Sequence, residues 1–204
     1  MLLVVRELTI ALVGDQTTPA DVLLFWFGAP GSRGKRDKRW FEKNDAFDVE
    51  IRRRFLDLYE QAAAGKLSHL KAMPQDCLAL ILLLDQFPRN MFRGAPRAFA
   101  ADPLALDAAR HAVAQGYDGA MLPVERLFAY LPFQHSETLE DQYKACELCK
   151  ALEAFEETAD AYRFAVRHRD IIERFGRFPH RNAVLGRAST PEEIEFLKSP
   201  RSSF

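Results

Sequence analysis

The sequence marks three helix starts with the same two-residue signal, and this constrains the fold more than any other feature. A residue that can cap a helix is followed directly by proline at three places, Thr18-Pro19, Asp102-Pro103 and Thr190-Pro191. The capping side chain accepts a hydrogen bond from a free backbone amide, and proline at the first helical position has no amide left to satisfy. Glu193 completes a capping box with Thr190. We therefore expect a helix to begin at each place.

Apolar residues recur between these starts with helical spacing. Over residues 46–64 they fall on one face, and Gly65 follows, where a helix end favours glycine. The run 77–84 is apolar all round, and its leucines and alanines, with Pro74 ahead of them, favour a buried central helix over a strand. No segment after residue 15 alternates apolar and polar residues. The sequence thus predicts an all-α fold with about seven or eight helices.

Further expected helices bear on the candidate site. We expect a short helix over 122–131 and a long one over 137–157, with the most regular apolar stripe between 161 and 175. Small residues recur at helical spacing over 105–116, where two helices could approach closely. We expect one helical domain over residues 18–204, preceded by a leader over residues 1–17.

Charge and cysteine content narrow the class of protein. The formal net charge is −1 at pH 7, which argues against nucleic acid as the partner because such binding needs a basic surface. No apolar stretch reaches the length of a membrane span, so we expect no membrane partner. Arg6 and Glu7 interrupt the apolar amino terminus, which is unlike a signal peptide. Three cysteines, few and odd in number, favour a reducing compartment, and we predict a cytoplasmic protein.

Two segments far apart in the sequence repeat one polar pattern. The first reads Phe87-Pro88-Arg89-Asn90 and the second reads Phe178-Pro179-His180-Arg181-Asn182. In each we expect proline to end an apolar helix and Arg-Asn to open a loop. The pattern is either a repeated helix-to-helix turn or two loops that converge on one anionic ligand, since guanidinium groups suit carboxylate and phosphate. The candidate ligand-binding residues are Arg89, Asn90, Arg93, Arg177, His180, Arg181 and Asn182.

Two further histidines are candidates for chemistry. His168 lies in the apolar stripe, either as a core residue with one hydrogen bond or as a cavity residue whose shifted pKa suits proton transfer. His135 and Glu137 precede an expected helix and could form an acid–base pair. Alternatively, Ser136 or Thr138 caps that helix and Glu137 favours the positive end of its dipole.

The spacing of the histidine, glutamate and cysteine residues indicates neither a metal site nor a redox site. His135, Glu137, His168 and His180 are metal ligands by type, but their spacing matches no metal motif, so we predict no metal site. Cys146 and Cys149 are spaced like a redox pair, yet they fall inside an expected helix, away from the terminus that lowers a thiol pKa. We interpret both as packing residues. No motif identifies a cofactor.

Several of these segments together resemble one bacterial family. They are Leu84-Asp85-Gln86-Phe87-Pro88-Arg89-Asn90, residues 132–137, His168-Arg169-Asp170 and residues 175–182. From about Thr18 to Leu197 the chain resembles the family catalogued as domain of unknown function 924. The resemblance implies a tetratricopeptide-like fold, a right-handed array of antiparallel helix hairpins, and it implies no activity or catalytic residues. The sequence has no clean repeat period, so any such repeats are degenerate.

Three functional hypotheses follow. The first is a helical binding module that holds a peptide or a small anionic ligand at the Arg/Asn/His-rich loops. The second is a hydrolase in which His135 or His168 is the general base and Glu137 or Asp170 orients it, which requires both histidines to share a cavity. The third is a structural network in which the arginines, aspartates and asparagines satisfy one another. The oligomeric state is not predicted.

Overall fold

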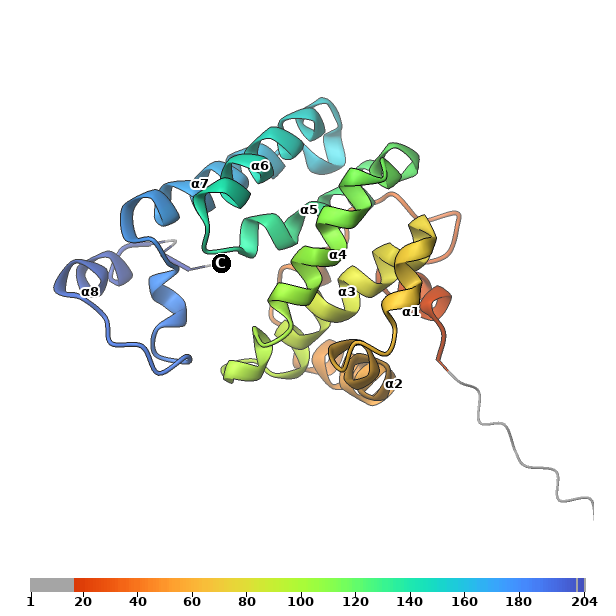
Figure 1. Ribbon diagram of the computed structural model, residues 1–204, viewed down its shortest axis with the longest axis horizontal. Coiled ribbons are helices and arrows are strands. Elements are labelled where there is room, and N and C mark those ends of the chain that lie inside the picture. The colour runs from red at the N-terminus through yellow and green to blue at the C-terminus, as the bar shows by residue number, and fades with distance from the viewer. Residues whose placement is uncertain (1–16, 201, 204) are drawn as a thin grey trace, which may run out of the picture.

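The computed structural model describes residues 17–200, 202 and 203, which fold into eight α-helices joined by loops and short 3₁₀ turns (Figure 1). No β-strand occurs in this part of the chain, so the all-α prediction is confirmed. The helices are α1 (Pro19–Phe27), α2 (Asp45–Ala63), α3 (Pro74–Met91), α4 (Asp102–Ala114), α5 (Pro123–His135), α6 (Leu139–Lys150), α7 (Ala161–Phe175) and α8 (Pro191–Leu197). The expected leader lies almost wholly outside the described residues.

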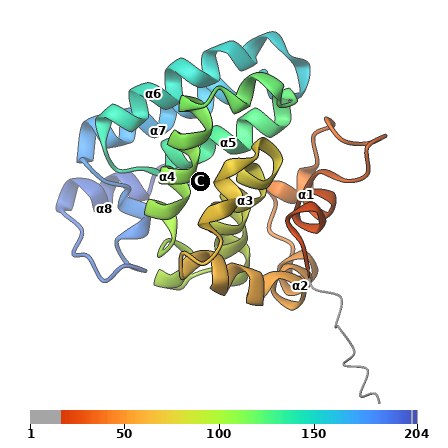
Figure 2. The ribbon, with the colours of Figure 1, turned by 45° about the vertical axis from the view of Figure 1, so that its right-hand side comes forward.

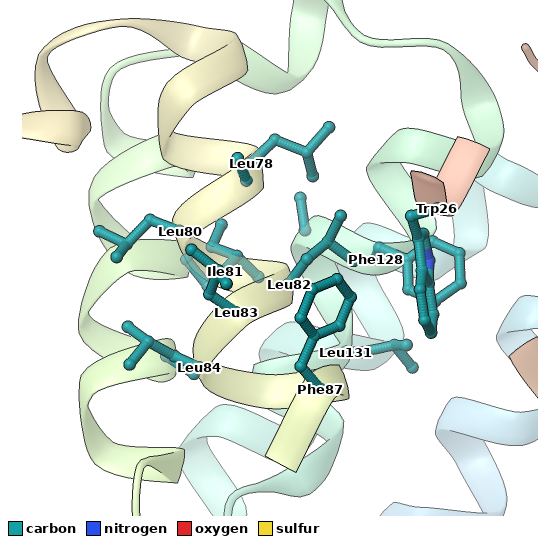
Figure 3. Packing of buried hydrophobic residues seen from close by; sticks show 14 of the residues in the cluster. Trp26, Leu78, Leu80, Ile81, Leu82, Leu83, Leu84, Phe87, Phe128 and Leu131 are labelled. Atoms are coloured by element: carbon teal, nitrogen blue, oxygen red, sulfur yellow. The ribbon is translucent and has the colours of Figure 1, made fainter. Parts of the chain in front are cut away.

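Helix α3 forms the centre of the molecule and packs against α1, α2, α4 and α5 (Figure 2). It is the buried helix that the apolar run predicts. Figure 3 shows Leu80 and Leu84 on one side of it, and Leu82 and Phe87 on the other, toward Trp26. Each fully buried leucine or phenylalanine contributes roughly 1.5–3 kcal/mol by leaving water. A helix covered on all sides holds its few polar side chains in fixed positions.

The other helices pack against their neighbours in the order of the sequence. Successive helices from α2 to α7 contact one another, and α6 lies beside α7 (Figures 1 and 2). The small residues of α4 are fully buried, as their spacing suggests. A separate apolar cluster, built on Ile171, Ile172 and Phe178, fixes the carboxyl-terminal segment against α7. A right-handed tetratricopeptide-like array remains a prediction. None of the described helices combines the length and apolarity needed to cross a bilayer.

Two prolines expected beyond helix ends lie inside helices instead. Pro88 is within α3, which continues to Met91, and Pro132 is within α5, which continues to His135. Proline removes one hydrogen bond of the helix ladder, and the packing of the buried residues around it keeps each helix intact. Arg89 and His135 are therefore helical residues rather than loop residues. The positions of α3 and α5 determine the directions of their side chains.

A helix begins at each of the three predicted places, and the predicted cap is confirmed at two of them. Thr18 and Thr190 both form capping boxes. Asp102, however, is the first residue of α4 and not its cap, and its carboxylate bonds arginines instead. The helix expected over 137–157 is shorter, since α6 ends at Lys150 and 3₁₀ turns follow.

Candidate functional site

A pocket of about 360 Å³ lies where α4 begins and α5 ends. Its polar wall consists of Asp102, His135, Ser136, Glu137 and Arg181, and its apolar wall includes Phe99, Leu106 and Leu185. Arg181 comes from the 3₁₀ turn Pro179–Arg181, far away in the sequence. The volume falls at the small end of the range for small-molecule sites. Several of the residues singled out by sequence are thus gathered around one small cavity.

His135 and Asp85 form the closest polar pair at this pocket. Nδ1 of His135 lies 2.6 Å from Oδ1 of Asp85, across 50 residues of sequence. Asp85 is fully buried in α3, and its other oxygen accepts a hydrogen bond from Gln86 Nε2 at 2.6 Å. An ionised carboxylate only accepts hydrogen bonds, so Nδ1 carries the proton and Nε2 of a neutral ring does not. Nothing in the described part of the chain forms a hydrogen bond with that Nε2.

The charges around this pair fix its protonation. Burial tends to raise the pKa of Asp85, but the charge of Arg89 and the contact with His135 hold it below its usual range. Burial and the charge of Arg89 lower the pKa of His135, against the opposing effect of Asp85. Near neutral pH the pair is therefore an ionised carboxylate behind a neutral imidazole. Such an imidazole is a base whose orientation is already set.

Two arginines of the repeated pattern meet at Asp102. Arg89 forms a bidentate pair with it, with Nη1 to Oδ1 at 2.8 Å and Nη2 to Oδ2 at 3.0 Å, and also donates to the backbone oxygen of Asp85 at 2.6 Å. Nη1 of Arg181 lies 3.4 Å from Oδ2 of the same carboxylate. The first and second segments of the pattern do converge, through these two residues.

Arg181 is held in an unusual environment for a cation. Its guanidinium lies between two rings, 4.8 Å from the centre of Phe99 and 4.6 Å from that of Phe178. Its side chain is 8% exposed, and Nε is buried with no hydrogen-bond partner in the described structure. Burial and the nearby charge of Arg89 lower the pKa of Arg181 to about 10. Its charge is thus the least compensated at the pocket.

His168 lies close to His135 but does not line the pocket. The two ring centres are 6.3 Å apart, and Nδ1 of His168 lies 2.8 Å from the backbone oxygen of Phe164. Burial lowers the pKa of His168 to about 3, so its ring is neutral. Its surroundings are those of a core histidine with a backbone hydrogen bond, the plainer of the two readings of this residue.

The carboxylates expected to orient a histidine are paired with arginines instead, which corrects that prediction. Glu137 pairs with Arg187 at 2.7 and 3.0 Å and accepts the backbone N–H of Phe178 at 2.8 Å. Asp170 is exposed and pairs with Arg169. The orienting carboxylate is Asp85, which sequence reasoning missed. The sequence did contain a signal, since Asp85 directly follows the apolar run 77–84 of a helix expected to be buried. A charged residue in such a place is buried only if it has a partner.

The other candidate ligand-binding residues hold loops and helices together. Asn90 and Arg93 both donate to Asp48 of α2. Arg177 forms a bidentate pair with Glu193 at 2.7 and 2.8 Å.

His180 and Asn182 flank Arg181 in the sequence. Asn182 bonds Ser189 and Arg187, each at 3.0 Å. The ring of His180 lies 5.6 Å from that of Phe178 at an angle of 44°, and burial and the charge of Arg181 lower the pKa of His180 to about 4. Within the described residues, no three His, Cys, Asp or Glu side chains are grouped as a metal site.

Comparison with known proteins places the chain in a family. Residues 22–201 match the family model described as bacterial protein of unknown function (DUF924). A solved structure of a protein of unknown function from Agrobacterium tumefaciens is similar, with a TM-score of 0.80 and 43% sequence identity. The match covers 88% of this chain and 96% of that one. No functionally curated protein matches. The chain therefore belongs to the DUF924 family of bacterial proteins, as the sequence motifs indicate.

Proposed function

We propose that this protein binds a small anionic ligand, a carboxylate or a phosphate, in the pocket lined by Arg181 and His135. The observation that carries the proposal is the state of Arg181, a buried cation at the wall of the pocket with a single long contact to a carboxylate. Asp102 is already engaged in two shorter bonds with Arg89. Burying a charge without close compensation is costly. An anion in the pocket would supply the compensation.

The geometry of Arg181 also suits recognition. The two flanking rings keep its guanidinium plane in place, so less conformational entropy is lost when an anion binds. The planar fork of donors matches the spacing of carboxylate and phosphate oxygens. Glu137 also lines the pocket, but Arg187 neutralises it through two hydrogen bonds.

The size of the pocket favours a metabolite over a peptide. The volume of about 360 Å³ lies at the small end of the range of about 300–1,000 Å³ that small-molecule sites cover. That is enough for a small carboxylic acid or a phosphorylated fragment. The side chains of Phe99, Leu106 and Leu185 would contact the apolar part of such a ligand.

Thermal unfolding with added succinate and, separately, inorganic phosphate tests the proposal. A ligand at about 100 times its dissociation constant stabilises the folded state by about 2.7 kcal/mol. For a chain of this size each kcal/mol raises Tm by roughly 2–4 °C. Arg181→Met should abolish the rise, whereas Arg53→Met, at an exposed arginine of α2, should retain it. The proposal fails if neither anion raises Tm, or if the rise persists in Arg181→Met.

We also propose a cytoplasmic location, with neither nucleic acid nor membrane as partner. The three cysteines are free thiols and all are buried, a pattern that suits a reducing compartment. The near-zero net charge offers no electrostatic attraction to polyanions.

A further inference from the structure

We infer that this pocket is catalytic, with His135 as a general base that activates water to hydrolyse a small ester bearing an anionic group. The inference rests on the anion-binding function proposed above, because Arg181 would hold the charged group of the ester.

The arrangement of Asp85 and His135 is that of a base and the group that orients it. Asp85 lies behind the ring, fully buried, and His135 forms part of the pocket wall. A carboxylate in this position fixes the tautomer of the imidazole and stabilises the imidazolium that forms when Nε2 takes a proton. Asp85 is thus a positioning residue, and His135 is the catalytic one.

His168 provides an internal comparison. It too is a buried histidine, but its Nδ1 faces a backbone carbonyl and its ring lies outside the pocket. His135, by contrast, lies against the ionised carboxylate of Asp85 and lines the pocket, and its Nε2 forms no hydrogen bond within the described residues.

The side chains of the pocket indicate that water is the nucleophile. Ser136 is the hydroxyl residue of the pocket wall, and its Oγ donates to Asp141 Oδ2 at 2.7 Å. Asp141 is itself held by Arg110 and Thr138, so the hydroxyl is directed away from His135. No cysteine lines the pocket. An imidazole without a neighbouring side-chain nucleophile acts most directly on a bound water molecule.

The reaction balances without any co-reactant. The oxygen of water bonds to the carbonyl carbon of the ester as one of its protons passes to Nε2 of His135. The tetrahedral intermediate then collapses, the carbon–oxygen bond to the leaving alcohol breaks, and the proton on Nε2 passes to that oxygen. The products are a carboxylic acid and an alcohol, and Asp85 remains ionised throughout.

Hydrolysis of mono-4-nitrophenyl succinate, a small ester with one free carboxylate, tests the inference. We expect saturable hydrolysis by the wild-type protein and a fall in kcat/KM of about 100-fold or more in His135→Gln, the usual contribution of a general base. His69→Gln is the matched control, because His69 is exposed and does not line the pocket. Asp85→Asn should lower kcat with little change in KM. Circular dichroism establishes that each variant is folded.

The pH profile separates positioning from a merely structural role. A general base acts when it is neutral, so the rate should fall on the acid side, with a limb below the ordinary histidine pKa of about 6.5. Asp85→Asn should displace that limb. If His135→Gln does not fold, carbethoxylation of the wild-type imidazole replaces it. Modification of His135 should stop hydrolysis, succinate should slow the modification, and hydroxylamine should restore activity.

Calorimetric titration with succinate distinguishes failure of this inference from failure of the proposed function. Binding of succinate without hydrolysis of the ester leaves the binding function standing and overturns the catalytic one. If neither occurs, both are wrong. Hydrolysis that is equal in wild type and His135→Gln, or that survives carbethoxylation of His135, also overturns the inference.

Discussion

Arg89 and Arg181 come from opposite halves of the sequence to the same carboxylate, Asp102, and they bind it unequally. Arg89 forms two hydrogen bonds of 2.8 and 3.0 Å, whereas Arg181 has one contact of 3.4 Å. The charge of Arg89 is thus neutralised by a carboxylate of the protein. The charge of Arg181, at the pocket wall, is neutralised only weakly. A structural network would satisfy both, so the inequality supports Arg181 as the arginine that binds the proposed anion.

Replacing each arginine by methionine should separate these roles. Arg181→Met removes a buried cation whose pKa is already lowered to about 10, so the free energy of unfolding should change by less than about 1 kcal/mol. Arg89→Met leaves Asp85 and Asp102 without their closest cation and should cost about 3 kcal/mol or more. Urea denaturation at pH 7 measures both. Equal, large losses would favour the structural network.

Asp85→Asn should destabilise the folded state by roughly 3 kcal/mol. The substitution leaves the buried charge of Arg89 with Asp102 as its remaining carboxylate and weakens the hydrogen bond to His135. Asp107, an exposed carboxylate of α4, gives a matched control, and Asp107→Asn should shift stability by no more than about 0.5 kcal/mol. Similar losses in the two variants would argue against a buried ion pair at Asp85.

Stability should fall as the pH drops below the ordinary histidine pKa of about 6.5. Burial lowers the pKa of His168 to about 3 and that of His180 to about 4 in the folded state, so the unfolded state binds protons first. The free energy of unfolding is unaffected by these two histidines above pH 6.5. Between pH 6.5 and about pH 4 each of them lowers it by up to about 1.4 kcal/mol per pH unit. Urea titrations at pH 7, 6 and 5 measure the slope. It should be shallower in a folded His168→Gln variant and unchanged in His69→Gln.

The three thiols should resist alkylation in the native protein. Burial raises the pKa of Cys149 to about 12 and that of Cys77 to about 11, and it also raises the pKa of Cys146. Since only the thiolate reacts, iodoacetamide at pH 8 should label these residues slowly until urea unfolds the chain. Mass spectrometry of the peptides gives the extent of labelling. Rapid labelling of Cys146 or Cys149 without urea would revive a redox role for the pair.

Glu137→Gln should lower stability by about 1–3 kcal/mol. It replaces a carboxylate that accepts two hydrogen bonds from Arg187 and one from the backbone of Phe178. Asp170→Asn, at an exposed side chain, should change stability by no more than about 0.5 kcal/mol. Thermal unfolding of the two variants gives the comparison. Equal effects would contradict a stabilising role for the hydrogen bonds of Glu137 to Arg187 and Phe178.

The sequence by itself determined the features that depend on neighbouring residues. Capping residues and prolines identify helix starts at Thr18 and Thr190 because caps are local hydrogen bonds. The all-round apolar run identifies α3 as the central helix because burial on every side leaves no polar face. The same local rules failed at Pro88 and Pro132, where tertiary packing keeps the helix intact across the proline.

The site was decided by the tertiary structure. Sequence spacing offered Glu137 and Asp170 as partners for a histidine, because both are near one along the chain. The fold instead brings Asp85 of α3 to His135 of α5, and Arg181 to the carboxylate that Arg89 already holds. Such pairings depend on the directions of two packed helices, which no local pattern encodes. A carboxylate and an imidazole 50 residues apart meet because α3 and α5 share one core, and the burial that brings them together also sets their charges.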